Sequence, residues 1–180
     1  VSESAQIINN ILTYSRIKMP SYESAWIFDI LYDCMSSAEN RFNDPMITIE
    51  KDLSSIKGKH MFTDPFQGRE VVNNLVNNAF QSISTKPGLV SMKAVVNEQD
   101  MLIVIVRDTG EGVDKEDIAR IYDPFFTRKS RGTGLGLLTT KKIVQQHGGK
   151  VSFESAEGSG SRFRLEFPRD RLPGANASES

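Results

Sequence analysis

The sequence has few of the residues that bring chemistry or cross-links by themselves: its 180 residues include one cysteine, two histidines and one tryptophan. A lone cysteine, Cys34, cannot form a disulfide within the chain, and its apolar surroundings favour a buried, inert thiol in a reducing compartment. No apolar run approaches the roughly 20 residues of a membrane span, and the first residues lack the apolar core of a secretory signal. We therefore expect a soluble piece of protein, whose parent could still be anchored upstream.

The chain also has almost no net charge. Its 22 Lys and Arg against 23 Asp and Glu give a formal net charge of -1 and a pI of about 6.2. This balance excludes a global field that would draw the chain to nucleic acid or to an acidic membrane surface. A polyanionic ligand would have to be bound by a local group of side chains.

Hydrophobic residues make up 38% of the chain, which is enough for one domain with a real core. Apolar periodicity predicts helices at residues 1–18, 24–42, 69–83 and 137–146, and strands at 46–50, 89–97, 101–107, 151–155 and 161–167. The strand at 101–106 is apolar at every position, which is typical of an interior strand covered on both faces. We predict an α/β two-layer sandwich, with a mixed sheet of about five strands and about three helices on one face.

An asparagine-rich helix at residues 69–83 is the first candidate site. At about 100° per residue its apolar positions fall on one side, whereas Asn74, Asn78 and Gln81 fall on the opposite side. Asparagine is a poor interior helix former, so this composition favours a use for the amide oxygens. Such oxygens suit a Mg²⁺ that keeps most of its waters and phosphate contacts. A surface helix that happens to be rich in asparagine is the alternative.

The motif DTGEGV at residues 108–113 is the second candidate. Asp108 directly follows the apolar strand, where an unpaired carboxylate is costly and a ligand amine, such as the adenine N6 group, or backbone donors would satisfy it. Gly110 and Gly112 would let the backbone approach a flat ring or adopt a positive φ. An ordinary tight turn explains the same segment.

The motif GTGLGL at residues 132–137, which leads into a helix, is the third. Glycines allow backbone N–H groups to face phosphate oxygens, and the helix N-terminus adds its positive end. Arg128, Lys129 and Arg131 would complement phosphate charge. A glycine-rich turn without a ligand and a solvated basic loop explain these features nearly as well.

In this order, the motifs resemble those of the catalytic and ATP-binding domain of sensor histidine kinases, the HATPase_c domain. That domain belongs to the GHKL superfamily, with DNA gyrase, the ninety-kilodalton heat-shock chaperones and the MutL proteins. NNLVNNAFQS resembles the N box, DTGEGV the G1 box, DPFFTRK the F box and GTGLGL the G2 box, while HGGKVSFES and GSGSRFRLEFP resemble the closing strands. The resemblance covers about residues 21–168 and implies a Bergerat-type ATP-binding fold.

The resemblance implies ATP and Mg²⁺ as cofactors and assigns a role to each motif. Asn78 would coordinate magnesium, Asp108 would receive the adenine amine, Phe125 and Phe126 would anchor a lid, and Lys129 would reach phosphate. The remaining residues would lie near the phosphates, along the base or, for Ser161, on the adenine side through water. The implied ATP-binding set is Asn74, Asn78, Gln81, Asp108, Gly110, Gly112, Val113, Phe126, Lys129, Gly132, Thr133, Gly134, Leu135, Gly136, Leu137 and Ser161, with Asn78 as the metal ligand.

Three positions depart from related patterns. Asn74 stands where the ATPase branches of the superfamily carry the glutamate that activates water, which favours transfer to a histidine over hydrolysis. Gln81 stands where lysine is common in the kinases, and Arg128 where threonine is common. The last two put details of phosphate contact in doubt.

No histidine of this chain has the setting of a phosphoacceptor. We expect His60 in a loop and His147 at a helix end, where a positive charge would favour the helix dipole. Residues 1–20 resemble the end of a second dimerisation helix with its linker, residues 21–168 form the domain, and residues 169–180 are expected to be a disordered tail.

The resemblance therefore implies partners outside the chain. These are the protein's own dimerisation and phosphoacceptor domain, the receiver domain of a response regulator, and a second copy in a full-length homodimer, with no role for nucleic acid. It implies a cytoplasmic location, compatible with a parent anchored in the inner membrane.

Three other interpretations compete with this one. Asp108-Thr109-Gly110 also resembles the signature of an aspartic protease monomer, but the asparagine-rich helix and GTGLGL have no role there. A calcium loop beginning at Asp108 fails because Gly110, Gly112 and Ala119 stand where oxygen ligands are required. A non-catalytic module that senses ATP or binds a protein partner is the more serious rival.

Overall fold

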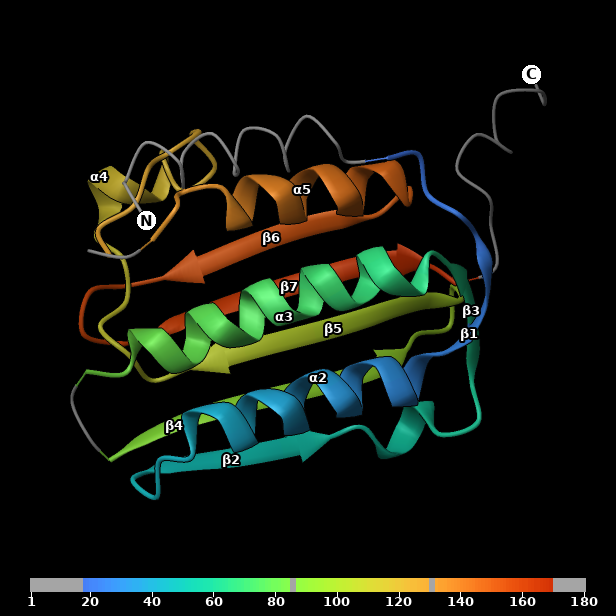
Figure 1. Cartoon of the computed structure of the whole chain (residues 1–180), viewed down its shortest axis with the longest axis horizontal. Coiled ribbons are helices and arrows are strands. Elements are labelled where there is room, and N and C mark those ends of the chain that lie inside the picture. Colours follow the sequence, from blue (N-terminus) through green and yellow to red (C-terminus); the bar gives the residue numbers. More distant parts are fainter. Residues whose placement is uncertain (1–17, 85–86, 130–131, 170–180) are drawn as a thin grey trace.

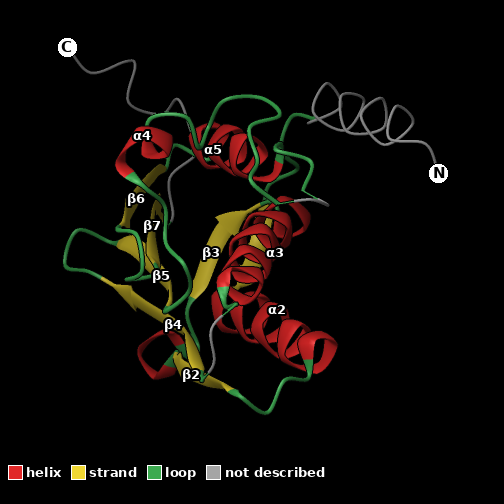
Figure 2. Cartoon of the chain, turned by 90° about the vertical axis from the view of Figure 1, so that its left-hand side faces the viewer, coloured by secondary structure: helices red, strands yellow, loops and turns green. Residues whose placement is uncertain are grey.

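The computed structural model describes residues 18–84, 87–129 and 132–169 (Figure 1). The elements are β1 (Glu23–Trp26), α2 (Ile27–Phe42), β2 (Ile47–Asp52), η1 (Ser54–Ile56), β3 (His60–Thr63), α3 (Pro65–Ser82), β4 (Gly88–Val96), β5 (Met101–Asp108), α4 (Lys115–Ile118), α5 (Gly136–Gln146), β6 (Lys150–Ser155) and β7 (Ser161–Pro168). Helices α2, α3 and α5 lie on one face of a five-stranded sheet (Figures 1 and 2). The predicted two-layer α/β sandwich is confirmed. Among the described residues, no helix is both long and apolar enough to span a bilayer.

The sheet is mixed and has the strand order β2-β4-β5-β7-β6. Strands β2 and β4 are parallel, whereas β4, β5, β7 and β6 pair antiparallel with their neighbours. This register places the last residue of β5, Asp108, opposite Val90 on one side and Ser161 on the other. The middle strand of the sheet therefore delivers Asp108 to one end of the sandwich.

The all-apolar strand β5 is interior, as predicted, but helices cover only one of its faces. Leu102, Val104 and Val106 belong to the core under the helices. On the other face, Ile103 is only 4% exposed, and its cross-strand partner in β7 is Glu166. Ile103 is thus buried on the face of the sheet opposite the helices.

The small sheet formed by β1 and β3 was not predicted. Residues 23–26 pair antiparallel with residues 60–63, so the chain is a strand where a helix was expected to begin, and His60 lies in β3 and not in a loop. Both strands have four residues, too few for a clear alternation of apolar and polar positions. Their stability comes from pairing between distant segments, which local periodicity cannot reveal.

Helix α3 begins at Pro65, four residues earlier than its apolar pattern indicated. The carboxylate of Asp64 accepts hydrogen bonds from the backbone N–H groups of Phe66 and Gln67, both at 3.0 Å, and so caps the helix. Proline is favoured at the first helical position because its missing N–H costs nothing there. The same carboxylate accepts a hydrogen bond from the backbone N–H of Ser21 at 2.9 Å, which ties the incoming chain to this helix.

Two predicted segments fall mainly outside the described residues. The expected helix at residues 1–18 lies there except for Lys18, whose carbonyl oxygen accepts a hydrogen bond from Gln67 at 2.9 Å. Of the expected tail at residues 169–180, only Arg169 is described. Its guanidinium donates to Asp100 at 2.7 Å and to the carbonyl oxygen of His60 at 2.9 Å. Contacts that hold the domain together thus continue at least to Arg169.

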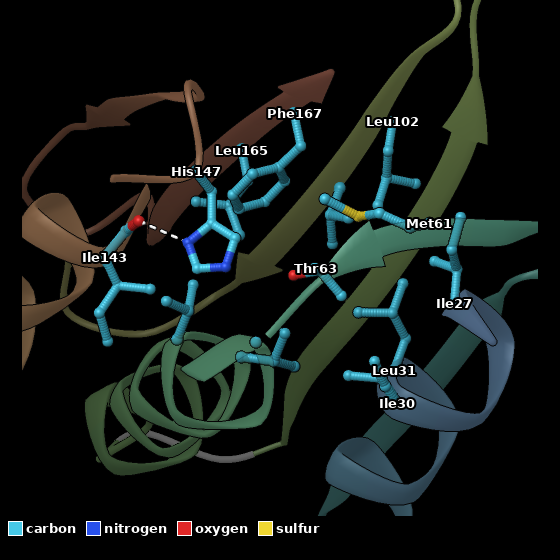
Figure 3. A pocket seen from close by; sticks show the side chains of 14 residues that line it. Ile27, Ile30, Leu31, Met61, Thr63, Leu102, Ile143, His147, Leu165 and Phe167 are labelled. Carbon is cyan, nitrogen blue, oxygen red and sulfur yellow. Dashed lines mark hydrogen bonds between the residues drawn. The ribbon is translucent and has the colours of Figure 1, made fainter. Parts of the chain in front are cut away.

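A small cavity of about 40 Å³ lies between the helices and the sheet, near the start of α3 (Figure 3). Its lining is apolar apart from Thr63 and His147, and Gly68 of α3 borders it. A Cβ atom added to Gly68 would meet no atom within 4 Å. The helix therefore contains a glycine whose side-chain position is open space.

We expect Gly68→Ala to stabilise the protein by about 1 kcal/mol, because alanine is the better helix former and the new methyl group enters unfilled space. Thermal unfolding should show a rise in Tm of about 3 °C. Gly58→Ala is the matched control: its Cβ would also meet nothing within 4 Å, but its φ of +72° disfavours a side chain. A loss of stability in Gly68→Ala would contradict this account of the cavity.

His147 follows α5 and is buried at 4% exposure. Its Nδ1 lies 2.9 Å from the carbonyl oxygen of Ile143, and its Nε2 lies 3.3 Å from the backbone nitrogen of Asp64, whose N–H donates to it. This arrangement requires a neutral ring with the proton on Nδ1. Burial lowers the pKa of His147, against a smaller opposing effect of the Ile143 hydrogen bond. It is therefore a neutral link between α5 and α3, and not the cation expected at a helix end.

Because the folded state lowers the pKa of His147, the stability that it contributes is complete above the unfolded pKa of about 6.5 and is lost as the pH falls below it. We expect the Tm to drop between pH 7.5 and pH 5.5, and the drop to be smaller in His147→Gln. His60→Gln, in strand β3, should keep the wild-type drop. An equal drop in wild type and His147→Gln would exclude this histidine as the source.

Candidate functional site

The amide groups predicted on α3 form one end of the candidate site. The ammonium group of Lys129 donates hydrogen bonds to Oδ1 of Asn78 and to Oε1 of Gln81, both at 3.0 Å. Although Lys129 is an exposed residue as a whole, its ammonium lies over these amides, and this desolvation lowers its pKa while the charge of Asp108 opposes the shift. The side chain of Lys129, in the segment after β5, therefore contacts the polar side of α3 that the sequence predicted.

Asn74 lies one turn earlier and has a different contact. Its amide nitrogen donates to the carbonyl oxygen of Gly136 at 3.2 Å and lies 3.5 Å from Oγ1 of Thr140. This contact ties α3 to the first residue of α5, so the glycine-rich loop and the asparagine-rich helix belong to one site. A neutral amide stands there, with no carboxylate to act as a base.

Asp108 forms the other end of the site and is 4% exposed. One of its oxygens, Oδ1, accepts hydrogen bonds from the hydroxyl of Ser82 and from the backbone N–H of Gly110, both at 2.8 Å. Burial raises the pKa of Asp108, and hydrogen bonds from Gly110, Ser82 and the Ser161 backbone partly offset that shift. Asp108 is therefore a buried carboxylate that contacts Ser82, the last residue of α3. Ser82 follows Asn78 by one helical turn.

The glycines after Asp108 are required by packing within the protein. A Cβ on Gly110 would lie 2.1 Å from the hydroxyl oxygen of Ser82, and one on Gly112 would lie 2.0 Å from the carbonyl oxygen of Ala156. Gly112 also has a φ of +70°. Two uses were predicted for these glycines, a positive φ and a close approach of the backbone to another group. Gly112 has the positive φ. Both glycines also lie close to other segments of the chain, at Ser82 and Ala156.

The residues that follow connect this loop to the last hairpin. The backbone N–H of Val113 donates to Oγ of Ser155 at 2.8 Å, and that hydroxyl lies 3.0 Å from the hydroxyl of Ser161. Ser161 is in turn the β7 partner of Asp108. The predicted residues Asp108, Val113 and Ser161 thus lie together.

The glycine-rich segment from Gly132 to Leu137 forms a turn that leads into α5, which begins at Gly136. Gly134 has a φ of +67°, and a Cβ there would lie 2.3 Å from the backbone of Phe125, whose N–H donates to the Gly134 carbonyl at 3.1 Å. In the part of the chain that the structure describes, no side-chain hydrogen bond caps the first turn of α5. Leu135 is buried and Leu137 packs against the core, so their side chains are used in packing. The free backbone N–H groups at such a helix N-terminus can donate hydrogen bonds to phosphate oxygens.

The segment between Val113 and the glycine loop is held by charged contacts that the sequence did not reveal. The guanidinium of Arg128 forms ion pairs with Asp114 and Asp117 at the start of α4. The guanidinium of Arg120 lies 4.4 Å from the centre of the Phe126 ring. The Arg128 departure from the family pattern therefore has partners within the protein, since its guanidinium pairs with two aspartates next to α4. Gly132 stabilises the same turn by donating its N–H to the carbonyl of Lys129 at 3.0 Å.

The donor set can be tested for its fit to Mg²⁺. Within residues 18–84, 87–129 and 132–169, no three His, Cys, Asp or Glu side chains come together as a metal site. The ammonium of Lys129 between two amide oxygens shows, however, that this position accepts a cation. A hard metal that takes few protein ligands and several phosphate and water oxygens is compatible with it.

Sequence reasoning missed Ser82 and Ser155. Ser82 had a visible signal, because it stands one helical turn after Asn78 on the same side of α3. Ser155 had none, because the path of the intervening loop decides its contact with Val113. Arg128 was predicted to complement phosphate charge, and in the structure it pairs with Asp114 and Asp117.

Comparisons with known proteins agree with this architecture. Residues 43–171 match the family described as Histidine kinase-, DNA gyrase B-, and HSP90-like ATPase. The chain is 29% identical over 163 residues to sporulation kinase E of Bacillus subtilis, and the match covers 90% of this chain and 22% of that kinase. A nucleotide-free structure of the catalytic domain of histidine kinase ThkA superposes with a TM-score of 0.73 at 25% identity, covering 83% of this chain and 97% of that one. Full-length ShkA in complex with AMPPNP gives a TM-score of 0.75 at 24% identity and covers 91% of this chain and 35% of that one.

The chain therefore belongs to the histidine kinase-, DNA gyrase B- and HSP90-like ATPase family. Within that family it is similar to the catalytic domains of sensor histidine kinases. It spans about a fifth of the length of sporulation kinase E.

Proposed function

We propose that this chain binds Mg-ATP and acts as the catalytic domain of a two-component sensor histidine kinase. The observation that carries the proposal is that α3 joins two kinds of site. At its end, Ser82 contacts the buried carboxylate of Asp108, and one turn earlier Asn78 holds a cation. A carboxylate suited to an adenine amine and an amide suited to a metal on phosphates thus meet the same helix one turn apart. The AMPPNP held by the fold neighbour ShkA supports the same ligand.

In this proposal each part of the site has one task. Asp108 accepts the adenine amine, which guanine replaces by a carbonyl oxygen. The uncapped start of α5 and the ammonium of Lys129 bind phosphate oxygens. Bound Mg²⁺, held by Asn78 through its amide oxygen, would neutralise phosphate charge during the reaction. The remaining proposed contacts, from Gly110 through Val113 and from Gly132 through Leu137, are largely made by backbone.

The reaction proposed is transfer of the γ-phosphoryl group to a histidine nitrogen. The nitrogen attacks the γ-phosphorus, the bond to the β-γ bridging oxygen breaks, and ADP leaves with the electron pair. Hydrolysis would need a base to activate water, and the position one turn before Asn78 holds the neutral amide of Asn74, which is engaged by Gly136. The site therefore favours a stronger nucleophile supplied from elsewhere.

The acceptor and the later partners are also proposed. His60 lies in β3 and His147 is buried between α5 and α3, so neither is presented at the candidate site. We propose that residues 1–20 continue a dimerisation domain carrying the acceptor, that the full-length protein is a homodimer, and that a response regulator receives the phosphoryl group. A cytoplasmic location belongs to the same proposal.

Phosphoryl transfer can be tested by mixing this chain with γ-labelled ATP, Mg²⁺ and the separately produced dimerisation domain of its parent protein. We expect label on that domain, and none when its acceptor histidine is replaced by glutamine. If the chain binds ATP but never labels the domain, a non-catalytic ATP-sensing module is the better description. If it binds no ATP, the family relationship does not extend to nucleotide binding in this protein.

A further inference from the structure

Arg107 lies near the end of β5, on the face of the sheet opposite the helices. Its neighbours in the strand, Val106 and Asp108, are buried on the helix side, and side chains alternate between the two faces along a strand (Figure 2). Arg107 is exposed, and within the described part of the chain no Asp or Glu forms an ion pair with its guanidinium. This face of the sheet therefore presents a positive charge that the described residues do not neutralise.

The strand next to Arg107 adds a second positive charge. The residue directly opposite Arg107 in β7 is Arg162. Like charges directly opposite each other on a sheet are destabilising. Two residues further along β7, in contrast, Arg164 pairs with Glu166 at 3.0 Å. The pairing of Arg107 with Arg162 thus carries a cost that an anion held between the two guanidinium groups would remove.

A hollow of about 250 Å³ lies beside this pair and is lined by Arg107, Arg162, Glu154 and the turn of the last hairpin. Glu154 accepts an ion pair from Arg162 at 3.0 Å, but its side chain is 72% exposed, and such exposed pairs contribute little to stability. Two guanidinium groups and one carboxylate leave one positive charge among the lining side chains. One further carboxylate balances that charge, whereas a phosphate dianion exceeds it.

Apolar residues continue this surface along β5. Ile105 is half-buried and Ile103 is 4% exposed, and both lie on the same face of the strand as Arg107. A strand advances about 3.3 Å per residue, so neighbouring side chains on this face are spaced by about 7 Å. An extended peptide has the same spacing between its residues i and i+2. A segment with an acidic residue two positions from an apolar residue therefore matches both the cation and the apolar surface beside it.

We propose that the surface around Arg107 binds an extended acidic segment of a partner protein. An Asp or Glu side chain of that segment accepts hydrogen bonds from Arg107 and Arg162, because a planar guanidinium matches the geometry of a carboxylate. An apolar side chain two positions away packs on Ile105. The surface lies on the opposite face of β5 from Asp108, so it is distinct from the candidate nucleotide site, and the proposal does not depend on nucleotide binding.

The test is fluorescence anisotropy with a labelled peptide, Glu-Thr-Leu-Thr-Glu, and with the same peptide carrying Gln in place of Glu. Wild type should bind only the acidic peptide well. Arg107→Gln should weaken that binding about tenfold, the loss expected for one charge-assisted contact, whereas Glu154→Gln should strengthen it by releasing Arg162. The matched control is Arg69→Gln, which removes an arginine of α3 that pairs with Asp33 at 3.0 Å in the helix layer. It should bind the peptide like wild type.

Three results would overturn the proposal. The first is equal binding of the two peptides by wild type, or no binding of either. The second is an equal loss in Arg107→Gln and Arg69→Gln. The third is tighter binding of inorganic phosphate or of phosphatidylglycerol vesicles than of the acidic peptide, lost in Arg107→Gln, which would assign the two arginines to a phosphate group.

Thermal unfolding distinguishes a binding role of Arg107 from a structural one. Because Arg107→Gln removes the repulsion from Arg162, its Tm at low salt should equal that of wild type or exceed it by up to about 3 °C. A lower Tm would show that Arg107 supports the fold, and it would overturn the proposal.

Discussion

Asp108→Asn is expected to weaken ATP binding at least about a hundredfold while leaving the fold intact. The new amide oxygen can still accept the hydrogen bonds from Ser82 and Gly110, which are both 2.8 Å from Oδ1. The other carboxylate oxygen becomes an amide nitrogen, which donates where the adenine amine also donates. Leaving buried polar groups unpaired costs ~1–3 kcal/mol for each, and two groups face each other here.

The measurement is calorimetric titration with Mg-ATP, beside thermal unfolding to establish that the variant is folded. Asp52→Asn serves as the matched control, because Asp52 is an exposed aspartate of β2 that pairs with Lys93 at 2.9 Å. It should bind ATP like wild type. If Asp108→Asn kept an affinity within a few-fold of wild type, Asp108 would not be the adenine acceptor.

Asn78→Ala is expected to abolish the contribution of Mg²⁺ to nucleotide binding. The amide oxygen that holds the ammonium of Lys129 at 3.0 Å is the one proposed to hold the metal, and alanine removes it. Because alanine is the better helix former, α3 should remain intact or gain stability. The ATP affinity measured with Mg²⁺ should then fall to the value measured in EDTA.

Asn73→Ala provides the control on the same helix, since no contact links Asn73 to Lys129 in the described part of the chain. It should keep the wild-type dependence on Mg²⁺. An Asn78→Ala protein whose affinity still rises with Mg²⁺ as wild type does would show that the metal is held elsewhere. This outcome would leave the role of Asp108 untouched, so the two ends of the site are tested separately.

The layers of the fold were predictable because burial imposes a local period on the sequence. Val72, Leu75, Val76 and Ala79 of α3 repeat at helical spacing and are all buried. In β7, the buried residues Phe163, Leu165 and Phe167 alternate with polar ones. The small sheet of β1 and β3 was not predictable in this way, because residues 23 and 63 pair across the whole length of α2. The early start of α3 could have been predicted, since Asp64-Pro65 has the residue types of a helix cap and first position.

The site was predictable where chemistry imposes a cost on the sequence. A stripe of asparagines on α3 and a carboxylate at the end of an apolar strand are both expensive without a partner, and they mark Asn78 and Asp108. The contacts of Lys129 were not predictable, because 48 residues separate it from Gln81 and loop paths decide where its side chain reaches. Arg128 was visible as a possible phosphate contact and as a departure from the family, whereas in the structure it pairs with Asp114 and Asp117.

The most direct test of the central claim is a titration of the wild-type chain with ATP and with GTP, each in the presence of Mg²⁺ and of EDTA. The account predicts one ATP site per chain, tighter binding with Mg²⁺ than with EDTA, and at least tenfold weaker binding of GTP because guanine presents a carbonyl oxygen to Asp108. No ATP binding under any of these conditions, or equal affinity for GTP, would contradict it.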